Sequence, residues 1–529
     1  MPVPRRLLSS QDGQPLFDGA ATRRIEQRAA AGLPPHELMR RAGHALARLA
    51  RAVAPHARKA WIAAGPGNNG GDGLVLASLL RRAGVDVVVS LVGHSAQRAL
   101  PPDAAWALQC ARDDGATLID TLPDAASLAE FDLCVDALLG VGQTRAPTGA
   151  LADAIAALNA CRAPTLSVDV PTGLATDTGV ALGDAVVRAD HTLTLLTAKP
   201  GLVTGAGRDA AGDPWFDDLG VAPDAQDTPA ASLTGEADVA PLYPVRRHDA
   251  NKGSFGDVHV AGGAAGMVGA SLLASHAASV AGAGRVLVHA HSSDAGGVLP
   301  VDVRHPELML RPVAELQGAV RSNAKATVVA GCGGGDDIGA ELPGCLSNAA
   351  RLVLDADALN AIARDTGLRA QLKRRGARGL PTILTPHPLE AARLLGKTTA
   401  DVQADRLAAA RAIAADTGAV VVLKGSGTVI ASPDGRASIN PTGDARLATA
   451  GTGDVLAGWI GGTWAAQPHA PVDSPSAGID ATALAHRVAA AAAYVHGRAC
   501  DVAPGERLPL TAGVLADAMA RAVQALSSH

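Results

Sequence analysis

A short run near the C-terminal end of the chain, Gly451-Thr452-Gly453-Asp454, directly precedes an apolar helical pattern. Free N–H groups at the start of a helix attract phosphate, and glycine lets a phosphate approach the backbone closely. A carboxylate at this place lies where phosphoryl transfer needs a general base. Aspartate is also a common helix N-cap, but other phosphate-binding signals precede this run. We therefore expect Asp454 to be a catalytic base rather than a cap alone.

Further signals for phosphate binding lie in the same half of the chain. Residues 262–270 and 331–335 are glycine-rich and each follows a predicted strand, although close helix–sheet packing also explains such glycines. Residues 424–428 (Lys-Gly-Ser-Gly-Thr) offer a cation, amides and two hydroxyls, which suit a nucleotide phosphate; a hairpin turn is the alternative. Asp355 ends a strand, where it could cap a helix, and His387 is fixed between two prolines. This placement favours ligand contact for His387.

The first half of the chain has a glycine-rich segment of its own, residues 65–73 (Gly-Pro-Gly-Asn-Asn-Gly-Gly-Asp-Gly). We interpret it as a turn between a strand and a helix. Ligands of open parallel sheets bind at the carboxyl ends of the strands, where such a turn brings amides to a phosphate. The asparagine pair and the aspartate add oxygen atoms that could ligate a hard cation. A tight turn with Asx caps is the structural alternative.

Two carboxylates follow later strands of the same half, Asp136 and Asp169. One aspartate after a strand is usually a helix cap. Two of them, with Asn69 and the hydroxyl of Thr172, would form a cage of oxygen atoms beside the glycine-rich segment. Because no histidine or cysteine cluster accompanies them, a monovalent or alkaline-earth cation fits better than zinc.

These residues need parallel strands to bring them together. Apolar strand signals alternate with helical patterns in both halves, which predicts an α/β protein with mostly parallel sheets covered on both faces. Residues 205–243, rich in Asp, Ala, Gly and Pro, read as the end of one domain plus a linker. We predict domains at residues 1–230 and 231–529. Predicted strands cover residues 61–64, 87–92, 131–135, 165–170, 192–196, 258–261, 285–289, 327–330, 352–354, 382–385 and 420–423, and predicted helices include residues 21–31, 34–49, 74–82, 268–281, 455–464, 481–498 and 512–526.

The bulk composition argues against several classes of protein. A chain of 529 residues with 48% hydrophobic and 18% charged residues can form large cores and exceeds one typical domain. Its formal net charge of -5 gives no reason to expect a nucleic-acid or membrane partner. Six cysteines without a Cys-x-x-Cys pair argue against zinc and a disulfide framework, and suit a reducing, cytoplasmic compartment. We expect no signal peptide and no membrane span.

Residues 20 to about 225 resemble the NAD(P)HX epimerase family, which has a Rossmann-like fold. The matching motifs include Asn-Asn-Gly-Gly-Asp-Gly at 68–73, Asp-Ala-Leu-Leu-Gly at 136–140, Val-Asp-Val-Pro-Thr-Gly at 168–173 and Lys-Pro-Gly at 199–201. The resemblance implies a potassium ion held by three oxygen ligands and a hydrated dinucleotide as substrate. The ion ligands are Asn69, Asp136 and Thr172, and the substrate contacts are Asn68, Asn69, Gly70, Gly71, Asp72, Gly140, Val141, Gly142, Gln143, Thr144, Arg145, Ala146 and Asp169.

Within this resemblance, Asp169 is our candidate for the catalytic residue. Epimerisation at the hydrated carbon of the nicotinamide ring needs a proton taken and returned, or a ring opening and closure, and a positioned carboxylate suits either route. Binding a ribose or a backbone amide is the alternative role. Thr172 stands where the family usually has serine, and it keeps the hydroxyl.

From about His248 to the C-terminus the chain resembles the ADP/ATP-dependent NAD(P)H-hydrate dehydratase family, which has a ribokinase-like fold. The matches include Asp-Ala-Asp-Ala-Leu-Asn at 355–360, Pro-Glu-Leu-Met at 306–309 and the Gly-Thr-Gly-Asp run. Two motifs depart from the family. Residues 332–335 read Cys-Gly-Gly-Gly instead of Pro-Gly-Leu-Gly, and residues 387–390 read His-Pro-Leu-Glu instead of His-Pro-Gly-Glu. Leu389 lacks the φ freedom of the usual glycine. The resemblance implies hydrate contacts at Ala270, Gly335, His387 and Asp454, and nucleotide contacts at Lys424, Gly425, Ser426, Gly427, Thr428 and Gly453.

Together the two resemblances imply a bifunctional repair enzyme. It would epimerise the R- and S-forms of NADHX and NADPHX and dehydrate the S-form, with ADP favoured over ATP by analogy alone and with magnesium arriving on the nucleotide. We expect a homo-oligomer. The alternative is a ribokinase-like kinase of a small vitamin-type alcohol, fused to a dinucleotide-binding module without catalysis.

Overall fold

The computed structural model divides the chain into two compact units, each with its own core. The first comprises Met1–Ser10 and Gln14–Ser232, and the second Gln11–Gly13 and Leu233–His529. The residues that the structure describes are 3–9, 11–95, 99–291, 301–468, 480–503, 505 and 508–526. No described helix is both long enough and apolar enough to cross a membrane.

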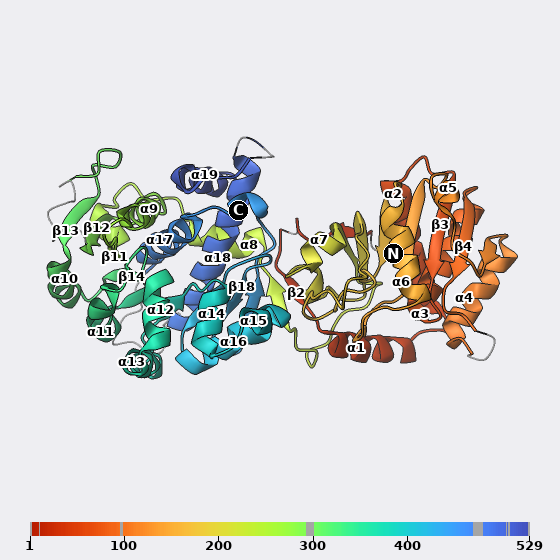
Figure 1. The fold of residues 1–529 in the computed structure, drawn as a ribbon, viewed down its shortest axis with the longest axis horizontal. Helices are drawn as coiled ribbons and strands as arrows, with labels where there is room; N and C mark the ends of the chain where they lie inside the picture. Colours follow the sequence, from red (N-terminus) through yellow and green to blue (C-terminus); the bar gives the residue numbers. More distant parts are fainter. Residues whose placement is uncertain are drawn as a thin grey trace. The chain divides into compact units, whose positions relative to one another are not determined.

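The first unit is built on an eight-stranded sheet in the order β1-β9-β8-β7-β6-β3-β4-β5 (Figure 1). Its neighbouring strands run parallel except for β1 and β9. The strands are β1 (Arg5–Arg6), β3 (Lys59–Ala64), β4 (Asp86–Leu91), β5 (Thr117–Ile119), β6 (Leu133–Ala137), β7 (Thr165–Val168), β8 (His191–Leu195) and β9 (Asp213–Asp217). The helices are α1 (Gly19–Ala31), α2 (Glu37–Val53), α3 (Asn68–Arg82), α4 (Pro102–Asp113), α5 (Ala125–Leu128), α6 (Ala150–Ala160), the 3-10 helix η1 (Pro200–Leu202) and α7 (Gly207–Ala211).

Alternate side chains of β3 show that this sheet is covered on both faces. Ile62 and its even-numbered neighbours belong to the cluster that contains α1, α2 and α3. Trp61 and Ala63 belong to a different cluster, which contains residues of α6. Since successive side chains of a strand point to opposite faces, helices lie on both sides of the sheet. The three-layer, Rossmann-like arrangement expected from the sequence is confirmed.

The second unit carries a sheet in the order β13-β12-β11-β14-β15-β16-β17-β18-β19, parallel from β13 to β17 and antiparallel at β18 and β19. Its strands are β11 (Asp257–Gly262), β12 (Arg285–Ala290), β13 (Met309–Pro312), β14 (Thr327–Ala330), β15 (Arg351–Leu354), β16 (Thr382–Leu384), β17 (Val420–Leu423), β18 (Val429–Ala431) and β19 (Ala437–Ile439). The short strands β2 (Gln14–Leu16) and β10 (Ala231–Leu233) lie where the chain passes between the units.

Helices cover both faces of the second sheet. Residues of α9, α17, α18 and α19 share one core cluster with Val258, Val329 and Val422 of the strands. Helices α10, α11 and α16 contact β11, β14 and β17 but contribute nothing to that cluster, so they lie on the opposite face. The helices are α8 (Glu236–Val239), α9 (Val268–Val280), α10 (Leu316–Ser322), α11 (Ile338–Asn348), α12 (Ala356–Arg364), α13 (Thr366–Ala377), α14 (Pro388–Leu395), α15 (Thr399–Ala404), α16 (Arg406–Thr417), α17 (Thr452–Ala465), α18 (Ala481–Val502) and α19 (Ala512–Gln524), with 3-10 turns η2 (Ala240–Leu242), η3 (Lys252–Phe255), η5 (Val313–Glu315) and η6 (Ala445–Leu447).

Two glycines bring α17 unusually close to α9 (Figure 1). A Cβ atom on Gly458 would overlap the carbonyl oxygen of Ala274, and one on Gly462 would overlap that of Ala278. Because only glycine leaves this space free, the two backbones can touch. The contact places the first turn of α17, which carries Asp454, beside the first turn of α9.

Three sequence expectations need correction. Residues 68–73 are not a turn: α3 begins at Asn68, so the glycines that follow are helical and serve close packing. The segment 205–243 is only partly a linker, since α7 and β9 occupy 207–217 and β9 lies between β8 and β1. The cysteines are not all far apart either: Cys134 of β6 lies beside Cys161, which follows α6, a proximity that the 27-residue spacing does not reveal.

Candidate functional site

A cavity of about 740 Å³ opens in the first unit at the carboxyl ends of four neighbouring strands, β8, β7, β6 and β3. The strands run parallel, so the segments that follow them meet at one edge of the sheet. The cavity lining includes the predicted site residues Asn68, Asn69, Asp72, Gly140, Val141 and Asp169.

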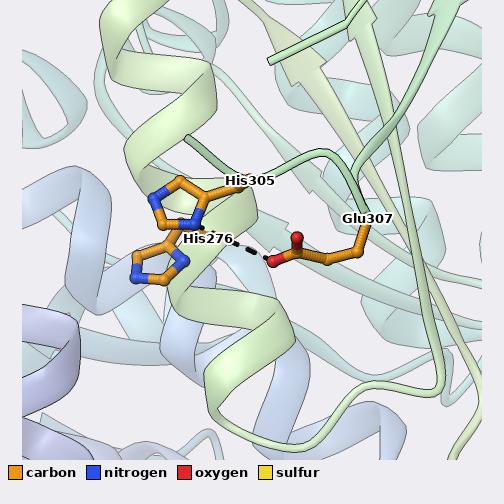
Figure 2. Close-up of side chains that lie close together, drawn as sticks. All are labelled: His276, His305 and Glu307. Atoms are coloured by element: carbon orange, nitrogen blue, oxygen red, sulfur yellow. Dashed lines mark ion pairs between the residues drawn. The ribbon is translucent and has the colours of Figure 1, made fainter. Parts of the chain in front are cut away.

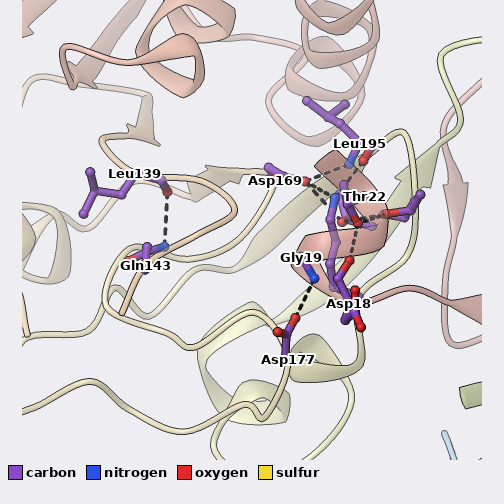
Figure 3. A network of polar contacts seen from close by, with 11 residues as sticks. Asp18, Gly19, Thr22, Leu139, Gln143, Asp169, Asp177 and Leu195 are labelled. Atoms are coloured by element: carbon purple, nitrogen blue, oxygen red, sulfur yellow. Dashed lines mark hydrogen bonds and ion pairs between the residues drawn. The ribbon is translucent and has the colours of Figure 1, made fainter. Parts of the chain in front are cut away.

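Asp169 has an uncommon backbone conformation for a residue with a side chain. Its φ is 67°, in the left-handed region, and such strain often accompanies functional positions. The carboxylate accepts hydrogen bonds from the Leu195 amide (3.1 Å; Figure 3) and from the Lys199 ammonium. Lys199 is fully buried, and its Nζ also donates to the Leu195 carbonyl at 2.7 Å. The contact therefore fixes the Asp169 side chain at the cavity wall, and Lys199, to which the sequence motif assigned no role, also lines the cavity.

Four further carboxyl groups line the same cavity, those of Glu26, Glu37, Asp72 and Asp103. Burial raises the pKa of Glu26, and the nearby Asp169 raises it further. Burial likewise raises the pKa of Asp72 well above its usual range, again with a contribution from Asp169. The cavity thus combines a carboxylate paired with a lysine and two carboxyl groups, Glu26 and Asp72, that hold their protons more firmly than usual. Glu26 is not among the site residues predicted from the sequence.

Helix α1, which carries Glu26, is anchored at its first turn (Figure 3). Asp18 caps the helix by accepting from the Ala21 amide at 2.7 Å, and Asp177 accepts from the Gly19 amide at 2.7 Å. The hydroxyls of Thr22 and Thr197 are 2.7 Å apart. These contacts tie the helix to segments that follow β7 and β8, so Glu26 is held over the cavity.

Asp136 and Thr172, two of the predicted cation ligands, lie together behind the cavity wall. Both are fully buried, and the Thr172 hydroxyl donates to Asp136 Oδ1 at 2.7 Å. Burial raises the pKa of Asp136, while hydrogen bonds from Thr172 lower it. The third, Asn69, lies against Gly140 and has a buried Nδ2 with no hydrogen-bond partner among the described residues. All three offer oxygen atoms, a donor set that suits a hard cation.

The other predicted contacts of the first unit lie outside the cavity lining. Gly70 and Gly71 are buried in α3. The side chain of Gln143 bonds to backbone, accepting from the Gly173 amide at 2.6 Å and donating to the Leu139 carbonyl at 3.4 Å (Figure 3). It therefore joins two loops. The remaining members of this group are Gly142, Thr144, Arg145 and Ala146, all exposed.

In the second unit the predicted residues follow five neighbouring parallel strands, β11, β14, β15, β16 and β17. The loops after β11 and β14 bond to each other, the Ala264 amide to the Gly333 carbonyl at 2.7 Å. Ala270 lies close to Gly333, and the Gly335 amide donates to Asp357 Oδ2 at 2.9 Å. The sheet thus gathers these loops at one edge.

Asp454 lies at the centre of this edge. Ligand atoms of Asp454, Asp355 and Cys332 lie within 4.8 Å of one another. Burial raises the pKa of Asp454 to about 6, with a further contribution from Asp355. Lys424 Nζ is 2.8 Å from Asp355 Oδ1, and a Cβ atom on Gly453 would lie 3.2 Å from the same nitrogen. A carboxylate base, a cation and helix N-terminal amides therefore converge on one place.

A buried arginine, Arg406, holds the start of the loop of residues 424–428 through hydrogen bonds to backbone carbonyls. Arg406 Nη2 donates to the carbonyls of Leu423 (3.1 Å) and Lys424 (3.2 Å). Gly425 and Gly427 have φ values of 134° and 60°, which favour glycine. The Thr428 hydroxyl donates to the Gly425 carbonyl at 3.1 Å. Ser426 lies between them and is exposed.

His387 caps helix α14. Its Nδ1 accepts from the Leu389 amide at 3.1 Å, and its backbone amide donates to Glu390 Oε2 at 2.8 Å. Burial raises the pKa of Glu390 to about 7. Leu389 is helical and 45% exposed, so the loss of glycine's φ freedom, expected to disturb this loop, has no effect here.

Comparisons with known proteins cover both units. Residues 35–201 match the family model "YjeF-related protein N-terminus", and residues 258–524 match "NAD(P)H-hydrate dehydratase". A "Bifunctional NAD(P)H-hydrate repair enzyme Nnr" of Escherichia coli (strain K12) is 37% identical over 478 residues, 89% of this chain and 88% of that protein. A "Bifunctional NAD(P)H-hydrate repair enzyme" of Leishmania major is 37% identical over 462 residues, 82% and 81% of the two chains.

Among solved structures, an ADP/ATP-dependent NAD(P)H-hydrate dehydratase of Bacillus subtilis, co-crystallized with ATP/Mg2+, is 28% identical. The match covers 56% of this chain and 98% of that one, with a TM-score of 0.45.

Proposed function

The chain belongs to the family of bifunctional NAD(P)H-hydrate repair enzymes, and we propose that residues 1–230 carry its epimerase activity and residues 231–529 its dehydratase activity. The protein epimerises hydrated NADH and NADPH and dehydrates one epimer with an adenine nucleotide. The observation that carries the second assignment is the convergence of Asp454, Lys424 and the first turn of α17. The small-alcohol kinase is not favoured, because the relatives are repair enzymes along both units.

For the epimerase we propose that Asp169 is the base. It accepts the proton of the ring hydroxyl as the bond from the hydroxyl-bearing carbon to the ring nitrogen breaks, and a protonated carboxyl of Asp72 or Glu26 supplies a proton to that nitrogen. Both protons return in the reverse step, so the reaction needs no net acid. Lys199 holds the Asp169 side chain in place. The raised pKa values of Glu26 and Asp72 support this division of roles.

We further propose that Asn69, Asp136 and Thr172 bind a potassium ion. The buried Asp136 carboxylate supports the assignment, since a cation compensates a buried negative charge. When bound, the ion would supply positive charge beside the loop after β6. Thr172→Ser should keep potassium-dependent epimerisation, and Thr172→Val should lose it while dehydration of the S-form continues.

For the dehydratase we propose that Asp454 takes the proton of the ring hydroxyl as its oxygen attacks the terminal phosphate of the nucleotide. A bond forms from that oxygen to phosphorus, and the bond from phosphorus to the nucleotide's bridging oxygen breaks. The electron pair of the ring nitrogen then expels phosphate, and the departing phosphate takes the proton of the adjacent ring carbon, which restores the double bond of the dihydronicotinamide. Lys424 and the Gly453 amide stabilise the transferring charge. Magnesium, arriving with the nucleotide, would neutralise phosphate charge.

We also propose the finer properties expected from the sequence. ADP is the phosphoryl donor, giving AMP and phosphate. The substrates are NADHX and NADPHX. The enzyme works in the cytoplasm as a homo-oligomer, without a nucleic-acid or membrane partner, consistent with the net charge of -5.

A spectroscopic assay tests both activities at once. The protein is mixed with both epimers of hydrated NADH, magnesium, potassium and either ADP or ATP, and the return of reduced-nicotinamide absorbance is followed. Full recovery supports both activities and identifies the nucleotide. Recovery that stops at the share of the S-epimer means that the epimerase assignment is wrong. No recovery with either nucleotide overturns the dehydratase assignment and favours the alternative, a kinase of a small alcohol.

A further inference from the structure

A second cluster of ligand atoms lies in the C-terminal unit, in residues that the mechanism above does not use. His276 lies on α9, and His305 and Glu307 lie just before β13; one ligand atom of each falls within 4.8 Å of the others. The two imidazole rings stack with centroids 3.7 Å apart, and His305 Nδ1 is 3.8 Å from Glu307 Oε1. Figure 2 shows both rings with a nitrogen on the side of the Glu307 carboxylate.

The two nitrogens of His276 have different surroundings. Nδ1 is buried and has no hydrogen-bond partner among the described residues. Such an atom is unfavourable unless a ligand satisfies it. Nε2 lies 3.8 Å from Asp517 Oδ1 on α19. A histidine that binds a metal through one nitrogen usually directs the other toward a carboxylate, which fixes the ring. His276 has both features, an unpartnered Nδ1 that can bind a metal and an Nε2 that faces a carboxylate.

The segment that carries the other two residues is itself held in place. Asp302 Oδ1 accepts from the amides of Arg304 (2.8 Å) and His305 (3.3 Å). The Leu308 amide donates to the His305 carbonyl at 3.1 Å, and the Leu308 side chain is buried in the core. His305 and Glu307 therefore project from an ordered turn, and less entropy is lost when they bind a ligand.

We propose that His276, His305 and Glu307 bind a divalent cation of the zinc class, with Asp517 orienting His276. Two imidazoles and one carboxylate select Zn²⁺, Co²⁺ or Ni²⁺ over Mg²⁺. The lone pairs lie in the ring planes, so the rings, now 22° apart, must tilt further to converge on one ion. Three protein ligands leave a position for water. The ion would link α9 to the segment before β13 and, through Asp517, to α19.

The site has a structural consequence for the second unit. Helix α9 packs against α17, whose first turn carries Asp454, and against α19. An ion that binds the folded unit and not the unfolded chain stabilises it by mass action. We therefore expect zinc to raise the melting temperature of this unit, and magnesium to have no such effect through this site.

The test uses the full chain after chelator treatment, with Zn²⁺ added alone and followed by isothermal titration calorimetry. We expect the protein to bind one more equivalent of Zn²⁺ than either His305→Gln or Glu307→Gln, or to bind it at least tenfold more tightly. His248→Gln, which removes an exposed histidine of the same unit, should match the unaltered protein. Co²⁺ added instead should give visible d–d absorption that both cluster variants weaken.

The same experiment defines the contrary outcome. Equal stoichiometry and affinity in the unaltered protein and all three variants would place the bound zinc elsewhere and overturn the proposal, as would displacement of Zn²⁺ from the cluster by equimolar Mg²⁺. If His305→Gln does not fold, Glu307→Gln carries the test, because that side chain is 57% exposed. A zinc-induced rise in melting temperature that persists in Glu307→Gln would also contradict it.

Discussion

At the scale of single residues, the proposed role of Asp454 as a base makes the second reaction depend on its protonation. The residue must be ionised to accept a proton, and burial places its pKa at about 6. We expect kcat/KM for dehydration to be level above this pH and to fall about tenfold per unit below it, since only the ionised fraction acts. The measurement is a pH profile of absorbance recovery with the S-epimer alone.

Asp454→Asn is the control for that profile. It should lower the rate by about 10²- to 10⁴-fold, the usual contribution of a general base. A full-length protein that dehydrates at an unchanged rate between pH 5 and 7 would show that another group takes the proton.

The buried ion pair of Asp169 and Lys199 leads to a second prediction. Asp169→Asn should abolish epimerisation and leave dehydration of the S-form intact. Lys199→Met leaves a buried carboxylate without its partner, which costs about 3–5 kcal/mol in comparable pairs. Chemical denaturation of the full-length protein measures the loss of stability in Lys199→Met, and the epimerase assay measures the loss of activity in Asp169→Asn. An Asp169→Asn enzyme with full epimerisation would refute the catalytic role and leave substrate binding as the alternative.

At the scale of elements, the contact between α9 and α17 sets the position of Asp454. In a Gly462→Val variant the valine side chain would overlap the Ala278 carbonyl oxygen and force α17 away from α9. We expect a loss of stability of about 1–3 kcal/mol, typical of overpacking, and a marked fall in dehydration because Asp454 moves. Epimerisation should be unchanged, since the first unit has its own core.

A matched control for this substitution is Gly339→Ala in α11, where an added Cβ atom meets nothing within 4 Å. It should stabilise the second unit slightly, because alanine favours helix over glycine by about 0.8–1.0 kcal/mol. Thermal unfolding separates the two variants. If Gly462→Val were as stable and active as Gly339→Ala, the helices would not need their close contact.

At the scale of the whole molecule, two units with separate cores carry two complementary reactions. We expect Asp169→Asn and Asp454→Asn enzymes to complement each other when mixed. The first supplies dehydration and the second epimerisation, and the hydrate diffuses between them. Absorbance recovery from a mixture of both epimers should therefore reach completion, whereas either variant alone should not. Incomplete recovery in the mixture would mean that the hydrate must pass within one molecule.

Local patterns along the chain are enough to predict the architecture, and they indicate where a site can form. Strand signals that alternate with helices require parallel sheets, and parallel strands place the segments after β11, β14 and β17 at a common edge. Loops with glycine, aspartate or lysine directly after those strands could therefore be expected to meet. These patterns are local, because each can be recognised within about ten residues. Both units have the fold that the patterns predicted.

The pairing of side chains, in contrast, follows from the three-dimensional packing of the elements. Lys424 pairs with Asp355, and His276 stacks on His305, although the chain between each pair is long. Asp169 meets Lys199 because the residue after β7 takes a left-handed conformation. Burial, and with it the raised pKa of Asp454, arises when helices from distant parts of the chain close over the sheet. The spacing of residues along the sequence does not predict such packing, because the packing depends on all the helices and strands together.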